Sequence, residues 1–209
     1  MGLVTLDMKF ASLFREAASK MGVKTIHILD IDELPLSVLV VVAKKSELQL
    51  KNVKRRVLYV EDYPSLEELI ERVIEVLNEV EIYRNVLIAI DPGKTIGVAY
   101  LVNSKIIKTS TYFNEESMFE DIKTFLERHR EADEKIIVIG STTTQEELSK
   151  LLQVMTRQFK GVEGLRIEVL DEFRTTRGVI PREKGLSKDE YSAIMLSLRK
   201  KLKLRRVGI

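Results

Sequence analysis

The apolar run at residues 86–90, Val-Leu-Ile-Ala-Ile, constrains the fold of this chain more than any other feature. A continuous β-prone run is typical of a strand that is covered on both faces, in the centre of a sheet. The run leads into Asp91, Pro92 and Gly93, where proline presets φ for the second turn position and glycine accepts a positive φ at the third. The sequence therefore predicts a buried central strand that ends in a carboxylate and a tight turn.

Alternating strand and helix patterns follow this run to the end of the chain. Asn103 and Ser104 indicate a turn between two strands, and Ser187 with Glu190 forms a capping-box signature at the start of the last helix. The predicted strands cover residues 97–102, 105–113, 135–140 and 166–170, and the predicted helices cover residues 115–129, 144–159 and 188–204. The order βββαβαβα predicts an α/β domain with a central mixed sheet. After the meander, each strand-helix-strand unit implies a parallel, right-handed crossover, so the first, fourth and fifth strands should point the same way.

The first part of the chain has a different pattern, αβββα. Apolar residues at helical spacing and β-rich runs predict helices at about residues 10–21 and 65–80 and strands at residues 24–29, 36–43 and 53–60. No catalytic motif is recognisable there. We therefore expect two domains, a small α+β domain of unknown role at residues 1–84 and a larger one at residues 85–209.

Composition excludes several classes of protein. The chain contains no cysteine, which rules out disulfides, thiolate metal sites and thiol nucleophiles and leaves carboxylates as the candidate reactive groups. No apolar run approaches the roughly 20 residues that span a bilayer, and the start of the sequence lacks a signal-peptide pattern. We expect a cytoplasmic protein with no membrane partner. Abundant lysine and glutamate would also suit a thermophile.

Charge is unevenly distributed although the formal net charge is only +2. Residues 1–84 carry 12 Lys/Arg and 14 Asp/Glu, whereas residues 85–209 carry 22 and 18. Basic clusters of this kind can neutralise phosphates without reading sequence. The candidate nucleic-acid contacts are Lys94, Arg174, Arg177, Arg182 and Lys184, with the basic tail at residues 199–206. The alternatives are an exposed turn lysine at Lys94 and a solvated helix end, where cations suit the dipole.

Acidic residues follow two of the predicted parallel strands and begin the last helix. Asp91 ends the first strand, Asp171 and Glu172 end the fifth, and Asp189 lies in the first turn of the helix. Ligands of open α/β sheets collect at the carboxyl ends of the strands, so three or four carboxylates are expected to converge there.

Three motifs resemble the RNase H-like nucleases of the RuvC and YqgF type. Residues 90–101, IDPGKTIGVAYL, resemble the first-strand motif of both groups, in which an acid, a small turn and a Gly-Val-Ala-like second strand recur. LDEFRTT at residues 170–176 resembles a segment of YqgF proteins, and KDEYSAIMLSL at residues 188–198 resembles the helix that carries their last catalytic aspartate. The resemblance covers about 120 residues and implies an RNase H-like fold.

The resemblance also implies the site residues. The fourth strand ends in Gly140-Ser141-Thr142 and not in the glutamate of RuvC, and the Gly-Leu-Pro signature of YqgF is absent. The YqgF pattern supplies its second acid from the fifth strand, so the implied catalytic and metal-binding residues are Asp91, Glu172 and Asp189. Such carboxylates suit two Mg²⁺ or Mn²⁺ ions, which would activate water and stabilise the leaving oxygen during phosphodiester cleavage.

Each acid also has a purely structural interpretation. Asp91 could serve the turn alone, Asp171 competes with Glu172 for the metal, and Asp189 could simply favour the positive end of the helix. On an ideal helical wheel, Asp189 falls on the Ala193 and Leu196 side of the last helix, away from the apolar stripe of Ile194, Leu198 and Leu202. It therefore faces the sheet only if the start of the helix is buried on both sides. Glu190 is best explained by the capping box.

The favoured function is Mg²⁺-dependent cleavage of structured DNA, such as a junction, or of structured RNA. One alternative is a non-catalytic protein of the same fold that binds nucleic acid or acts as a scaffold. A second is an ATP-binding domain of the actin and sugar-kinase type, but such proteins normally need two lobes and a longer chain. A homodimer is compatible with the sequence, which does not determine the oligomeric state.

Overall fold

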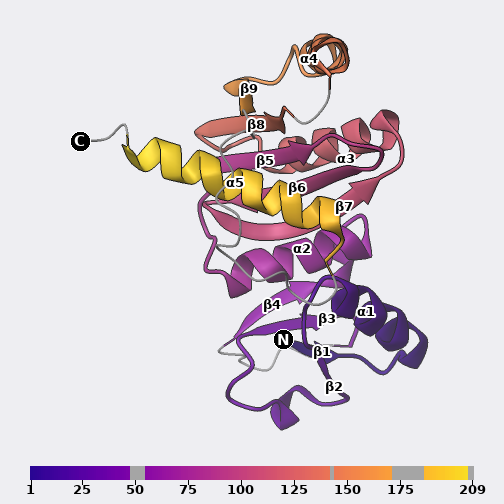
Figure 1. The fold of residues 1–209 in the computed structure, drawn as a ribbon. Coiled ribbons are helices and arrows are strands. Elements are labelled where there is room, and N and C mark those ends of the chain that lie inside the picture. Colours follow the sequence, from indigo (N-terminus) through magenta and orange to yellow (C-terminus); the bar gives the residue numbers. More distant parts are fainter. Residues whose placement is uncertain (48–54, 142–143, 171–185, 207–209) are drawn as a thin grey trace. The chain divides into compact units, whose positions relative to one another are not determined.

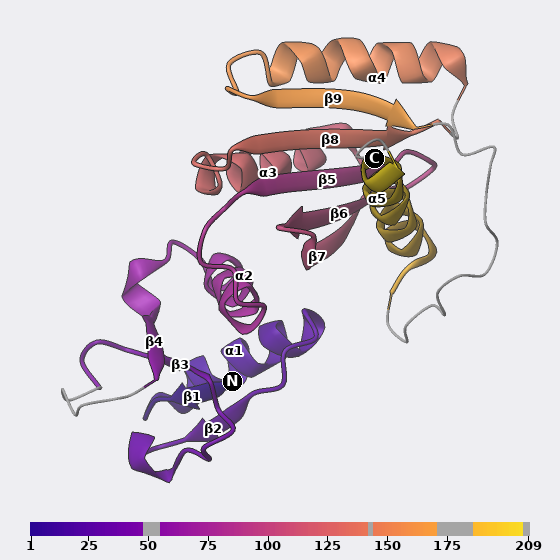
Figure 2. The same cartoon turned by 90° about the vertical axis from the view of Figure 1, so that its left-hand side faces the viewer.

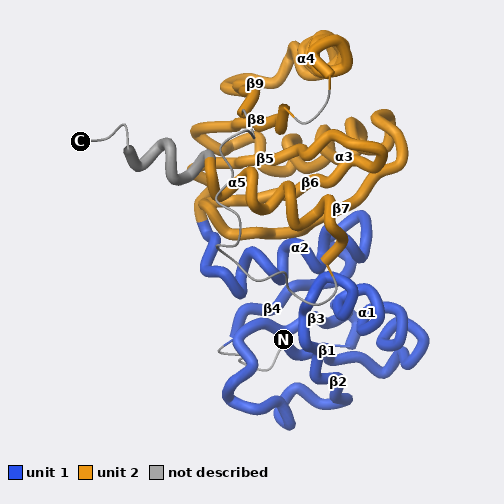
Figure 3. The backbone as a smooth tube through the Cα atoms, in the orientation of Figure 1, with its two compact units in different colours: residues 1–81 blue, residues 82–209 orange. Residues whose placement is uncertain are grey.

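A computed structural model describes residues 1–47, 55–141, 144–170 and 186–206, with side chains as far as Arg199. The chain divides into two compact units, residues 1–81 and 82–209 (Figure 3). The sequence analysis placed this division after residue 84. Each unit is an α/β structure with its own sheet. Within the described residues, no helix combines the length and apolar character that a membrane crossing requires.

The first unit contains a four-stranded, entirely parallel sheet of order β2-β1-β3-β4 (Figure 1). Its strands are β1 (Gly2–Val4), β2 (Ile26–Ile28), β3 (Val40–Ala43) and β4 (Arg56–Tyr59). Its helices are α1 (Met8–Lys20) and α2 (Leu66–Leu77), with short 3-10 turns η1 (Ile31–Glu33) and η2 (Val60–Asp62). Asp7 caps α1 through Phe10 N, and Ser65 caps α2 through Glu68 N.

The predicted αβββα order of this unit was wrong at its start, because β1 precedes the first helix. Three residues are too few for a periodic signal, and β1 forms only because β2 and β3 flank it. The β-rich run at residues 36–43 also yields a shorter strand than predicted, since Leu36 is 95% exposed. All four residues of β3 are buried, as a central parallel strand requires.

The second unit follows the predicted order βββαβαβα. Its strands are β5 (Asn85–Asp91), β6 (Ile96–Val102), β7 (Lys105–Tyr112), β8 (Glu134–Gly140) and β9 (Leu165–Leu170). Its helices are α3 (Glu115–Arg128), α4 (Gln145–Gln158) and α5 (Lys188–Arg206). The sheet has the order β7-β6-β5-β8-β9, in which β5, β8 and β9 are parallel and β6 is antiparallel to β5 and β7. The mixed sheet and its three parallel strands are therefore confirmed.

Two helices cover opposite faces of this sheet (Figures 1 and 2). Successive strand residues point to opposite faces, and in β6 the Tyr100 ring packs on Phe125 of α3, whereas Ala99 and Leu101 belong to a cluster with α5. Figure 2 shows α5 almost end-on, crossing the sheet near the arrowheads of β5, β8 and β9. The carboxyl ends of the parallel strands therefore lie beneath α5.

The two turns of the meander differ in how far they match the prediction. Asn103 and Ser104 have φ values of 48° and 66°, the left-handed pair that a two-residue hairpin turn requires. Asn103 Oδ1 also accepts hydrogen bonds from the backbone N–H of Arg84 and Asn85, at 2.9 and 3.2 Å. The expected positive φ at Gly93 was wrong, because only Gly22 and Gly164 among the described glycines adopt it. The turn after β5 is longer than a two-residue turn, since pairing resumes only with Asp91 opposite Gly97.

Candidate functional site

Asp91 is the last residue of β5 and is partly exposed. By strand alternation it shares a face with Leu87 and Ala89, both of which pack in the cluster formed with α5. The carboxylate therefore extends from the face of the sheet that α5 covers, at the carboxyl end of the central strand. Its cross-strand partner is Gly97 of β6.

Asp189 reaches the same place from the first turn of α5. Gly97 allows this approach, because a Cβ on that residue would overlap the carbonyl group of Asp189 and would lie 2.9 Å from its Cβ. Directly opposed residues in an antiparallel pair have Cβ atoms about 4.5–5.5 Å apart. The Cβ atoms of Asp91 and Asp189 are therefore no more than about 8.5 Å apart.

The beginning of α5 is held by its own cap and by the sheet. Ser187 N donates to Glu190 Oε2 at 2.7 Å, and Glu190 N donates to Ser187 Oγ at 3.1 Å, which confirms the predicted capping box. Ser187 Oγ also lies 3.0 Å from Thr111 Oγ1 of β7. These contacts satisfy exposed backbone donors of the first turn and anchor the start of α5 to β7.

The face that α5 presents to the sheet is not the predicted one. Ala193 and Leu196 are buried against it, whereas Ile194 is only half-buried. The reason is that the sheet residues beneath the helix, Gly97, Ala89 and Ala99, are small. With the small Ala193 facing them, the α5 backbone lies closer to the sheet than large side chains would allow. Asp189 lies on this buried side, and it faces the sheet for that reason.

Thr95 makes a contact that the sequence analysis missed. Its Oγ1 donates a hydrogen bond to Asp189 Oδ2, across 94 residues of sequence. Thr95 belongs to the segment between β5 and β6, so the segment that begins at Asp91 also contacts the second acid. A glycine inside a strand often marks a place where another backbone segment comes close. Gly97 was therefore the only feature of the sequence that hinted at the close packing of α5 on β6.

The remaining predicted site residues are only partly located. Lys94 is exposed in the turn after Asp91. β9 ends at Leu170, beside Gly140 and under α5. The predicted metal ligand Glu172, its competitor Asp171, and the predicted nucleic-acid contacts Arg174, Arg177, Arg182 and Lys184 lie outside the described residues.

The site as described is a pair of carboxylates with a hydroxyl beside one of them. Carboxylate oxygens are ligands that hard divalent cations such as Mg²⁺ and Mn²⁺ prefer, so the donors present are of the type that the predicted metal needs. Two carboxylates alone are fewer ligands than a metal ion held only by protein groups requires. No group of three or more acids or histidines within the described ranges could hold a metal ion.

Comparisons with known proteins add no relative from which a function could be transferred. No protein-family model matches the chain, and no curated protein matches it. The functional argument therefore depends on the residues and their arrangement.

Proposed function

We propose that the second unit is an RNase H-like nuclease, dependent on Mg²⁺ or Mn²⁺, that cleaves phosphodiester bonds of structured DNA or RNA. The observation that carries the proposal is the juxtaposition of Asp91 and Asp189 on one face of the sheet. These acids are about 100 residues apart in sequence, and they occupy the first and last of the three motifs that resemble RuvC and YqgF nucleases.

The topology supports this assignment. An antiparallel meander leads from the central strand β5, and β8 and β9 then run parallel to it. Ligands of α/β sheets bind outside the carboxyl ends of such strands. Asp91 stands at that edge on β5, and β9, which Glu172 follows closely in sequence, ends at the same edge.

Asp91, Asp189 and Glu172 would hold the metal in this proposal. When bound, two Mg²⁺ or Mn²⁺ ions would activate a water and stabilise the leaving oxygen of the phosphodiester. Without metal ions, the negative charge of these three acids would repel a phosphate, so substrate binding at this site would require the cations. The exposed Lys94 and the basic residues after Glu172 would bind the flanking phosphates.

Calorimetry and a cleavage assay on the full chain test the proposal. We expect millimolar or tighter Mn²⁺ binding and cleavage of at least one substrate among junctions, flaps, single strands and structured RNA. Asp91→Asn and Asp189→Asn should each abolish cleavage, because both carboxylates act on the same ions. Asp133→Asn is the matched control, since Asp133 is exposed and precedes β8 at the opposite edge of the sheet.

The same experiment separates the alternative of a non-catalytic nucleic-acid-binding protein. Nucleic-acid binding whose affinity falls steeply with salt, without divalent-ion binding or cleavage, would establish that alternative. Salt-independent binding, or none to any substrate, would contradict both. In the nuclease case, Lys94→Gln should weaken binding and reduce the salt slope by about one unit.

A further inference from the structure

The contact between Thr95 and Asp189 joins two segments that the proposed function needs together. Thr95 lies four residues after Asp91, and its hydroxyl donates to Oδ2 of Asp189. Within the described residues, this is the one hydrogen bond to the Asp189 side chain. A carboxylate offers about four lone-pair sites, so the contact occupies one of them and orients the group while acceptor capacity remains on both oxygens.

The surrounding packing explains why the hydroxyl can reach the acid. Gly97 leaves no side chain between β6 and the first turn of α5, so Asp189 lies directly against the strand that Thr95 precedes. The beginning of the helix is held independently by the capping box of Ser187 and by Thr111. The helix start thus has its own anchor, and the Thr95 contact acts on the side chain of Asp189.

We propose that Thr95 is a positioning residue, which holds the Asp189 carboxylate in the orientation that binds a divalent cation together with Asp91. This inference rests on the proposed function, and it adds a residue that neither the motifs nor the resemblance assigns. Hydrogen bonds to ligating carboxylates orient the ligands, and their removal typically lowers metal affinity or activity by about 10- to 100-fold.

Four threonine substitutions distinguish orientation of the acid from anchoring of the helix. Thr95→Val removes the hydroxyl at nearly constant volume, whereas Thr95→Ser keeps it and serves as the rescue. Thr111→Val removes the contact with Ser187 without touching Asp189. Thr109→Val, on β7 opposite Ala99, changes a half-buried threonine of the same sheet and controls for the loss of a hydroxyl.

The measurement is Mn²⁺ affinity of each full-length variant by calorimetry, with amide hydrogen exchange of residues 187–191 in the metal-free protein. We expect Thr95→Val to weaken Mn²⁺ binding by about tenfold or more. Thr95→Ser, Thr111→Val and Thr109→Val should stay within about twofold of the original chain. Exchange at the helix start should rise in Thr111→Val but not in Thr95→Val.

Three outcomes would overturn the inference. If Thr95→Val binds Mn²⁺ like the original chain while Asp189→Asn does not, Thr95 is no positioning residue and the proposed metal site stands. If Thr111→Val weakens binding as much as Thr95→Val and exchange rises in both, the contact only anchors α5. If the original chain binds no divalent ion with or without nucleic acid, both the inference and the proposed function fail.

Discussion

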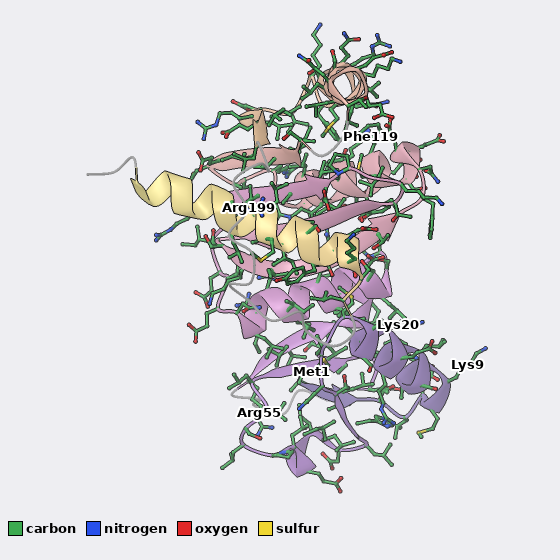
Figure 4. The ribbon with its side chains drawn as sticks, viewed as in Figure 1. Met1, Lys9, Lys20, Arg55, Phe119 and Arg199 are labelled. Carbon is green, nitrogen blue, oxygen red and sulfur yellow. The ribbon has the colours of Figure 1, made fainter. Side chains whose placement is uncertain are left out.

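The two faces of the five-stranded sheet each hold an aspartate supplied by a helix, and the two aspartates have opposite surroundings. On the α3 face, Asp121 accepts from Lys108 Nζ at 2.6 Å, from the Tyr100 hydroxyl at 3.1 Å and from the Tyr112 hydroxyl. On the α5 face, Asp189 accepts from the single hydroxyl of Thr95 within the described residues. In Figure 4, the label Phe119 marks α3, which covers one face of the sheet, and the label Arg199 marks α5, which covers the other.

The difference separates a structural carboxylate from one that has acceptor capacity for a ligand. Lys108 has a side chain only 4% exposed, and the charge of Asp121 compensates it while joining α3 to β6 and β7. Asp189 faces a second acid across Gly97 and has no lysine or arginine among its described partners. Two carboxylates close together repel each other, which favours the binding of a metal or another cation. The comparison makes four predictions.

The largest expected effect is a difference in stability between two variants, Asp121→Asn and Asp189→Asn, which each remove one carboxylate charge. Asp121→Asn should lower the free energy of unfolding by about 3 kcal/mol, since it leaves the buried Lys108 without its compensating charge. Asp189→Asn should change it by less than about 1 kcal/mol. Urea unfolding of the full chain measures both, with amide protection of β6 and β7 assigning the change to this unit. Equal losses would contradict the contrast between the faces.

The next effect concerns the close approach on the α5 face. Gly97→Ala should destabilise the protein by about 2 kcal/mol, because the new methyl group meets the backbone of Asp189 and α5 must move away. It should also weaken metal binding, since Asp189 moves with the helix. Gly161→Ala is the control, as nothing lies within 4 Å of its added Cβ. A neutral Gly97→Ala in urea unfolding would show that α5 does not pack this closely.

A third prediction uses pH to test the α3 face alone. Burial raises the pKa of the Tyr100 and Tyr112 hydroxyls above the ordinary value of 10.0. At Tyr100 the neighbouring Tyr112 phenol and then the charge of Asp121 add to this rise, and at Tyr112 the charge of Asp121 adds to it. A raised folded-state pKa contributes stability that is complete below pH 10 and lost as the pH rises above it. Tyr100→Phe should reduce this loss by up to about 1.4 kcal/mol per pH unit. Asp189→Asn should leave the slope unchanged in unfolding curves between pH 9 and 11.

The smallest effect is the repulsion between the two acids of the site. In a chelator at low salt, Asp91→Asn and Asp189→Asn should each raise the free energy of unfolding by up to about 0.5 kcal/mol, and the double variant by less than their sum. The coupling should shrink as salt screens the charges. A double-mutant cycle from urea unfolding measures it. Strict additivity at low salt would mean that the carboxylates lie too far apart to share an ion.

Much of the second unit was predictable because its signals are local. The apolar run before Asp91 predicted the central strand. The helix predicted at residues 115–129 forms as α3, and its buried residues recur at helical spacing: Met118, Phe119, Ile122, Phe125 and Leu126. The strand-helix-strand order then predicted which strands are parallel. In the first unit the strand β1 was missed, since three residues have no period of their own and pair only because neighbouring strands are in place.

The sequence predicted that Asp91 ends a strand and that Asp189 begins a helix, but it did not predict their contacts. The motifs indicated Asp91 and Asp189, but the helical wheel let Asp189 face the sheet only if the start of α5 is buried on both sides. The helical wheel predicts the sheet-facing side from the large apolar residues. In the structure, the small sheet residues beneath α5 determine which side of the helix faces the sheet. Thr95 had no local signal at all, because its partner lies in another element.

The sequence alone determined which segments of the second unit become strands and helices and where the last helix begins. It also determined that Asp91 ends a strand and that Asp189 begins a helix, because these features depend on periodicity, turn residues and caps within a few positions. Only the tertiary structure decided that Asp189 turns toward the sheet, that Gly97 admits it beside Asp91 and that Thr95 binds it. Those contacts join residues far apart in the chain, and steric fit between a helix and small strand residues selects them.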